Sequence, residues 1–240
     1  VSEDAAFCPN CGERLKLVEE RAGPRAREAR EGAFGHLSLA FDLAMRKPMV
    51  FVPAVLGGII SALLTGIAAL WLGPYTWLNW WAYPGSYGTF MSVVVLTVVV
   101  SLIGAIVSYI LFFASLDMSR DAYVDAPLSL GESVSYVLSR IGLFIVASIV
   151  GAILSITIIL IPVVILMFVV MIVDEAGIGA SISRAFSVLG RELSDVLILL
   201  AVGIVGSLIV GLIPFIGGLL STCLNVIIGL AFIDVYHSYK

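Results

Sequence analysis

The stretch IGLFIVASIVGAILSITIILIPVVILMFVVMIV, from Ile141 to Val173, contains no charged side chain and decides the fold of this chain. One straight helix over this stretch would rise about 50 Å, whereas the hydrocarbon core of a bilayer is about 30 Å thick. Pro162 lies near the middle, and a proline inside a helix removes a backbone donor and favours a turn or kink. The stretch therefore predicts a membrane hairpin that turns near Ile161 and Pro162.

The composition of the whole chain agrees with a membrane protein. Of its 240 residues, 60% are hydrophobic and 12% are charged, whereas soluble domains have about 45–50% and about 25%. The excess of apolar residues lies in long runs, which is typical of integral membrane proteins. Residues 1–30 contain no apolar segment behind a basic start, so we expect the first span to serve as the insertion signal.

The chain repeats one unit three times, a short amphipathic segment followed by an apolar hairpin. In the first segment, Asp42 and Arg46 are four residues apart, in the favourable order for an ion pair. In the second, Ser129 and Glu132 have the spacing of a capping box, which predicts that a helix begins there. Helix breakers stand near the junctions, namely Pro48, Gly142 and Gly190. They favour separate interfacial helices over the cytosolic ends of long tilted helices.

We therefore predict an all-α integral membrane protein whose six transmembrane helices form three hairpins, each preceded by an amphipathic interfacial helix. This membrane domain covers residues 33–240. It follows a short cysteine-containing segment at residues 1–15, which we call the knuckle, and a charged linker at residues 16–32. The predicted spans are residues 49–72, 89–115, 141–160, 162–173, 196–213 and 219–233. Because the third and fourth are short, the sequence leaves open whether they cross the bilayer or form a re-entrant loop.

The placement of charge predicts which side is cytosolic. All 13 Lys and Arg residues fall in the N-terminal segment, in two charged connections or at the C-terminal end. The three opposite connections, residues 73–88, 161–162 and 214–218, have no charge. By the positive-inside rule, both termini and all three amphipathic helices face the cytosol, and the protein lies in the cell membrane. The first outer connection and its margins hold all 4 tryptophans, which predicts a headgroup anchor; a binding lid for an apolar ligand is the alternative.

The predicted spans contain few residues that could take part in catalysis or in proton-coupled transport. No ionisable residue lies at their mid-depth, where proton-coupled transporters and pumps usually need one, and no catalytic motif stands beside a hairpin. We interpret five residues at the cytosolic ends as solvated, namely His36, Asp42, Asp117, Asp121 and Asp125. Asn225 is the one amide inside a span, and we expect it to hydrogen-bond to a neighbouring helix, a substrate contact being the alternative. Small residues at helical spacing, such as Ala147, Gly151 and Ser155, predict close helix packing.

Near the N-terminus, Cys8 and Cys11 form a CxxC followed by a glycine. Two thiolates at this spacing can bind one tetrahedral metal, and the glycine lets the backbone turn behind them. A structural zinc needs four ligands. His36, His237 and Cys223 are poor candidates for the rest, because they lie beside or inside predicted spans.

Residues 2–15, SEDAAFCPNCGERL, resemble the second half of the short zinc ribbons that head many prokaryotic membrane proteins. In that family an earlier CxxCG stands just upstream, joined by a similar linker. The resemblance implies a zinc site of Cys8, Cys11 and two upstream cysteines, whereas this chain begins inside the linker at Val1. We expect that the first knuckle has been lost; a metal shared by two chains and an empty knuckle are the alternatives.

Residues 33–240 resemble the membrane domain named after its fusion to glycerophosphoryl diester phosphodiesterases. Three stretches support this, DEAGIGASISRAF at 174–186, IPFIGG at 213–218 and AFIDVY at 231–236. The resemblance implies a six-span bundle with interfacial helices. It does not imply esterase activity, which in that family belongs to a separate soluble domain.

We therefore expect a non-enzymatic membrane protein that anchors or organises partners, with the N-terminal head contacting another protein. The bilayer and a second copy of the chain are the other expected partners. Nucleic acid is not expected, because no basic patch with exposed aromatic residues is present. The alternative is a transporter or lipid-handling protein for an uncharged or lipid-like ligand. A groove lined by Ser, Thr and Asn225 would favour this alternative, and a solid bundle would count against it.

Overall fold

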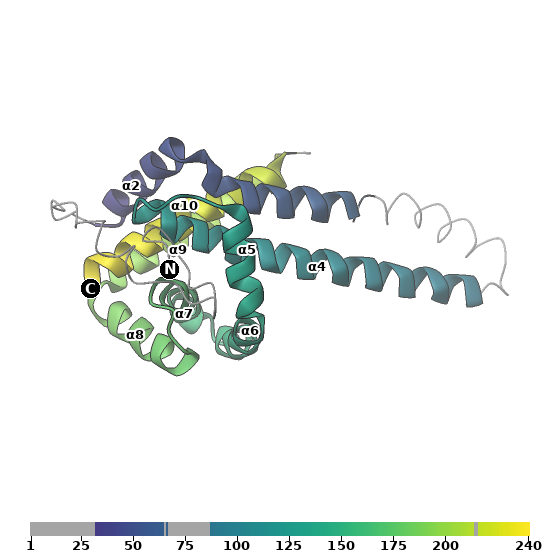
Figure 1. The fold of residues 1–240 in the computed structure, drawn as a ribbon. Coiled ribbons are helices and arrows are strands. Elements are labelled where there is room, and N and C mark those ends of the chain that lie inside the picture. The colour runs from purple at the N-terminus through teal and green to yellow at the C-terminus, as the bar shows by residue number, and fades with distance from the viewer. Residues whose placement is uncertain (1–31, 65, 67–86, 214–215) are drawn as a thin grey trace, which may run out of the picture.

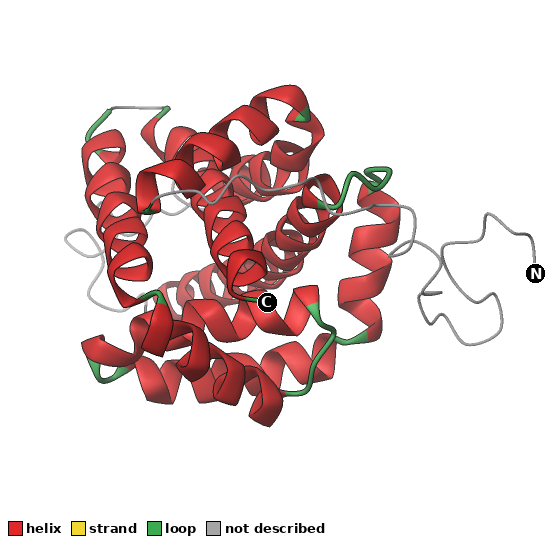
Figure 2. Cartoon of the chain, turned by 90° about the vertical axis from the view of Figure 1, so that its left-hand side faces the viewer, coloured by secondary structure: helices red, strands yellow, loops and turns green. Residues whose placement is uncertain are grey.

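A computed structural model describes residues 32–64, 66, 87–213 and 216–240. Over these ranges the chain forms helices and no strand, which confirms the all-α prediction (Figures 1 and 2). The knuckle with Cys8 and Cys11, the linker and the tryptophan-rich connection lie outside the described residues. The elements are α2 (Ala33–Arg46), η1 (Pro48–Phe51), α4 (Tyr87–Tyr123), α5 (Leu130–Ser139), α6 (Ile141–Ser155), η2 (Ile158–Leu160), α7 (Ile161–Val173), α8 (Ile178–Arg191), α9 (Leu193–Gly211) and α10 (Gly217–Tyr239).

Three helices are long and apolar enough to cross a membrane alone, namely α4, α9 and α10. Three bent pairs reach that length and composition only together. These pairs are α2 with the helix Pro48–Leu64, α5 with α6, and Ile158–Val173 with α8. The described residues therefore contain three to six candidate spans.

The bends separate amphipathic helices from apolar ones. The chain turns by 98° after α2, by 72° between α5 and α6, and by 120° between α7 and α8. At the first bend Lys47 has φ −124° and ψ 67°, because the residue before a proline is disfavoured in the helical region. At the start of α5, the Glu132 amide donates to Ser129 Oγ at 3.4 Å, as the capping box predicts. Breaks between an amphipathic and an apolar helix are therefore present at the first two junctions, and the third break, expected near Gly190, lies at Glu192 between α8 and α9.

The hairpin of α6 and α7 turns earlier than expected. The prediction of a turn at Ile161 and Pro162 is wrong, because α6 ends at Ser155 and α7 begins at Ile161. Pro162 lies in the first turn of α7, where a missing N–H costs little because it would have no partner in the helix. The helices rise about 22 Å and about 20 Å, less than the ~30 Å hydrocarbon core.

Gly151 explains how closely α6 and α7 pack. A Cβ atom at this position would lie 2.9 Å from Val164 Cγ1, which is too close for any side chain. The predicted small-residue contact is therefore confirmed for this pair of helices.

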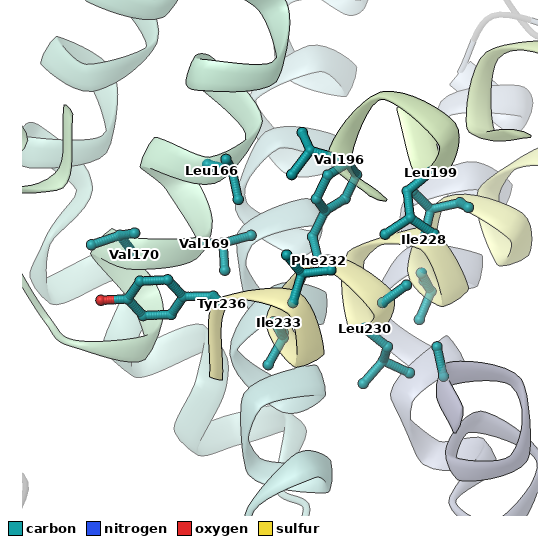
Figure 3. Packing of buried hydrophobic residues seen from close by; sticks show 14 of the residues in the cluster. Leu166, Val169, Val170, Val196, Leu199, Ile228, Leu230, Phe232, Ile233 and Tyr236 are labelled. Carbon is teal, nitrogen blue, oxygen red and sulfur yellow. The ribbon is translucent and has the colours of Figure 1, made fainter. Parts of the chain in front are cut away.

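Helix α10 is the centre of the fold and contacts α9, α2, α4 and α7. Its second half is buried over several turns, and Phe232 packs near Leu166 of α7 and Val196 of α9 (Figure 3). In contrast, the first half of α4 extends beyond the other helices, and Gly104 within it lies beside Leu64 (Figure 1). Its valines and leucines are exposed, for example Val95 at 60%, which suits contact with lipid chains.

Two helices continue beyond the ends of their predicted spans. Helix α4 continues past residue 115 to Tyr123, and α10 continues past residue 233 to Tyr239. The added turns contain charged residues whose partners lie on other helices, and these residues form the site described next.

Candidate functional site

Charged residues are buried where the amphipathic helices meet the ends of the apolar ones. The exposed fraction is 4% for His36, 0% for Asp117, 6% for Asp121 and 0% for Asp234. The interpretation of His36, Asp117 and Asp121 as solvated is therefore wrong. For Asp42 and Asp125 it is confirmed, because their side chains are 52% and 67% exposed. The buried residues lie in two clusters of charged contacts, and a third cluster surrounds Asp174, whose side chain is 6% exposed. We call the three clusters together the polar layer.

The first cluster surrounds His36 of α2. Its Nδ1 lies 2.7 Å from Asp234 Oδ2, and Tyr123 Oη donates to the other oxygen of Asp234 at 2.7 Å. His36 Nε2 lies 3.8 Å from Asp195 Oδ2, and Asp195 Oδ1 accepts from the Ala33 amide at 3.1 Å. Asp195 thus satisfies one of the free N–H groups at the start of α2. The cluster joins α2, α4, α9 and α10.

The second cluster surrounds Arg120 of α4, which is 7% exposed. Its Nη2 lies 3.1 Å from Asp121 Oδ1 and 3.2 Å from Asp117 Oδ1. Its Nη1 donates to the carbonyl of Ile172 at 2.9 Å and lies 3.5 Å from Glu175 Oε1. Arg120 therefore connects the end of α4 to the end of α7.

Glu175, in the turn between α7 and α8, extends this cluster. Arg140 donates to its side chain at 2.9 Å and to its carbonyl at 3.0 Å. Glu175 has φ 52°, a left-handed conformation that costs a residue other than glycine about 1–3 kcal/mol. The guanidinium groups of Arg120 and Arg140 lie 5.7 Å and 5.2 Å from the centre of the Tyr136 ring. The strained turn is thus held by charged and aromatic contacts.

The third cluster surrounds Asp174, the neighbour of Glu175. Lys240 Nζ donates to Asp174 Oδ1 at 2.7 Å, and Asp174 Oδ2 accepts from Arg184 and Tyr236. Burial alone would raise the pKa of Asp174. The hydrogen bonds from Lys240 and Tyr236 and the nearby cations outweigh burial and lower this pKa below its usual value. The cluster joins the end of α7 to α8 and to the end of α10.

No family model, curated protein or solved structure matches this chain. The chemistry of the site is therefore judged from its geometry. Within the described ranges, no group of three or more His, Cys, Asp or Glu residues could hold a metal ion. Cys223 is a free thiol on α10, and the predicted zinc ligands Cys8 and Cys11 lie outside these ranges. The polar layer is thus a set of mutual charge contacts that joins helices.

A groove lies away from the polar layer, between α7, α9 and α10. It has a volume of about 440 Å³ and is mostly apolar, with Ser207 and Asn225 as its polar residues. Asn225 is exposed, and among the described residues its amide makes no hydrogen bond to another helix. The expected interhelical bond is therefore wrong at this position. The full lining is Ile165, Leu200, Gly203, Ile204, Ser207, Leu208, Asn225, Ile228 and Phe232.

The sequence contained signals for parts of the polar layer. Asp117, Arg120 and Asp121 are spaced three and four apart, which places them on one helix face behind an apolar run. Asp234 is one carboxylate inside the apolar run AFIDV. A lone carboxylate in such a run favours burial with a partner over solvation. Neither signal names the partner, which lies far away along the chain.

Proposed function

We propose that this chain is a non-enzymatic integral membrane protein that anchors and organises partners at one face of the membrane. The observation that supports the proposal is the polar layer, in which buried charges contact one another across helices. Such contacts fix the amphipathic helices to the ends of the apolar helices and build a rigid platform. A reaction centre would instead need polar groups that converge on a space for a substrate.

We further propose that the chain crosses the cell membrane six times, with the polar layer and both termini on the cytosolic side. This topology agrees with the six spans that length and composition allow when each bent pair is counted as one broken span beside α4, α9 and α10. It is also supported by the positive-inside rule, because Arg120, Arg140, Arg184 and Lys240 all lie in the polar layer.

The resemblance of residues 33–240 to the phosphodiesterase-linked membrane domain stays a proposal. In this chain two of the stretches that suggested it are in contact, because Asp174 of the first stretch accepts from Tyr236 of the third.

The N-terminal head is proposed to hold zinc through Cys8 and Cys11 when two further cysteines are supplied, and to contact a partner protein. Adding an upstream CxxCG and titrating zinc tests this part. One zinc per chain with four thiolates is expected, and the absence of stoichiometric metal would refute the zinc head.

Cysteine accessibility tests the platform. In a background without native cysteines, Ser181→Cys and Ser187→Cys place thiols on the same helix, α8, at a buried and an exposed position. A membrane-impermeant maleimide applied from the cytosolic side should label Ser187→Cys and leave Ser181→Cys unlabelled. Comparable labelling of both variants in folded protein would mean that the polar layer opens, and would overturn the platform.

The alternative, a transporter or lipid-handling protein, is favoured by the groove with Ser207 and Asn225. The exposed side chains of Ile204 and Leu208, 49% and 66%, place this groove on the outside of the helices. Native mass spectrometry from lipid nanodiscs tests this function. A retained lipid that is lost in Asn225→Leu would support it.

A further inference from the structure

Among the described residues, Asn225 is a polar side chain with no hydrogen-bond partner on a mostly apolar surface. Its primary amide offers two donors and an acceptor, and α10 is apolar enough to cross a membrane. In hydrocarbon no water is present to satisfy such a group. Within the described part of the chain, no other helix supplies a hydrogen bond to it. Its partner must therefore come from outside the described helices.

We infer that the groove of α7, α9 and α10 is a self-association surface, whose occupant is the same face of a second copy. Two copies inserted in the same direction are related by a two-fold axis along the membrane normal. Because such an axis leaves each residue at the same membrane depth in both copies, Asn225 of one copy meets Asn225 of the other. A primary amide is complementary to itself, because each can donate one hydrogen bond and accept one. The acyl chain of a lipid offers neither a donor nor an acceptor.

The shape of the surface also suits a two-fold contact. Exposed Ile204 and Leu208 stand on α9, next to a hollow that reaches Gly203, Ile228 and Phe232. A two-fold interface pairs one patch with itself, so the projecting residues of each copy enter the hollow of the other. A small, half-buried residue such as Ser207 lets helices in a membrane approach closely. The dimer extends the proposed platform, but its formation does not depend on that function.

The test measures dimer formation by the full chain. Molar mass in detergent and single-molecule photobleaching in phosphatidylcholine vesicles over a range of protein-to-lipid ratios give the monomer–dimer equilibrium. We expect Asn225→Leu to weaken it about 8-fold to 300-fold, because both copies lose the amide and each of the two lost hydrogen bonds between membrane helices is worth about 0.6–1.7 kcal/mol. Asn225→Gln, which keeps the amide, should retain most of the affinity. Cys223→Leu, on the same helix outside the groove lining, is the matched control and should change nothing.

A second variant keeps the inference testable if the amide contributes little. Ser207→Phe fills the groove from a half-buried position and should also reduce the dimer. Thermal melting of each variant as a monomer in detergent checks that it is folded. A wild-type chain that stays monomeric at every density would overturn the inference. So would folded Asn225→Leu and Ser207→Phe variants that dimerise as the wild type does, or a lipid held in the groove of a monomer.

Discussion

Replacing Arg120 by methionine tests whether the buried charges stabilise the fold. Arg120 lies within 3.2 Å of both Asp117 and Asp121, and Asp117 is 0% exposed. Methionine fills much of the same volume but removes the guanidinium that both carboxylates contact. Removing one partner of a buried ion pair costs about 3–5 kcal/mol, because the remaining charge stays buried and uncompensated. We expect a loss of this size in the free energy of unfolding, measured by reversible SDS unfolding in mixed micelles.

A matched control is the exposed pair of Arg46 and Asp42, whose closest atoms lie 2.9 Å apart. Their side chains are 68% and 52% exposed, so Arg46→Met should cost at most about 0.5 kcal/mol. Combining Arg120→Met with Asp117→Asn should recover part of the stability lost in Arg120→Met, because one of the two carboxylates that Arg120 contacts is then neutral. If Arg120→Met and Arg46→Met destabilised the chain equally, the reasoning about burial would be refuted.

Three further predictions concern single contacts. Tyr123→Phe removes the hydroxyl that donates to Asp234 and should lower the free energy of unfolding by about 1–3 kcal/mol; an unchanged value would contradict that bond. Because the pKa of Asp174 is lowered in the folded state, its stabilising effect is complete above the unfolded pKa, about 3.9, and is lost as the pH falls through the folded pKa. The free energy of unfolding, measured from pH 6 to pH 2, should therefore fall with decreasing pH, and Asp174→Asn should reduce this fall. Equal slopes of this free energy against pH in the wild type and in Asp174→Asn would contradict the prediction. Gly151→Ala should cost about 1–3 kcal/mol by overpacking against α7, whereas Gly142→Ala, with open space around it, should not destabilise.

Local features could be predicted from the sequence because their causes are local. Ser129 caps α5, and Asp42 pairs with Arg46 four residues later. Pro48 follows a bend because it constrains the residue before it. Each of these features depends on residues within one helical turn.

The polar layer could not be predicted, because its partners are distant along the chain. Arg120 and Glu175 are 55 residues apart, and His36 and Asp234 are 198 apart. A charged residue beside or inside an apolar run can indicate burial, as Asp234 does, but only the tertiary contact shows which residue is its partner. The position of the turn between α6 and α7 could not be predicted from the sequence for a different reason. Its residues are as apolar as the helices beside it, so hydropathy does not mark it.

The turn between α7 and α8 has a mechanical consequence. Asp174 and Glu175 are consecutive, yet Asp174 binds Tyr236 and Lys240 of the C-terminal end whereas Glu175 binds Arg120 and Arg140. The turn therefore divides a pull on α8 between two groups of helices, in addition to the packing of Ala185 and Val188 in the core. Replacing either carboxylate by its amide would weaken the connection to one group and leave the connection to the other.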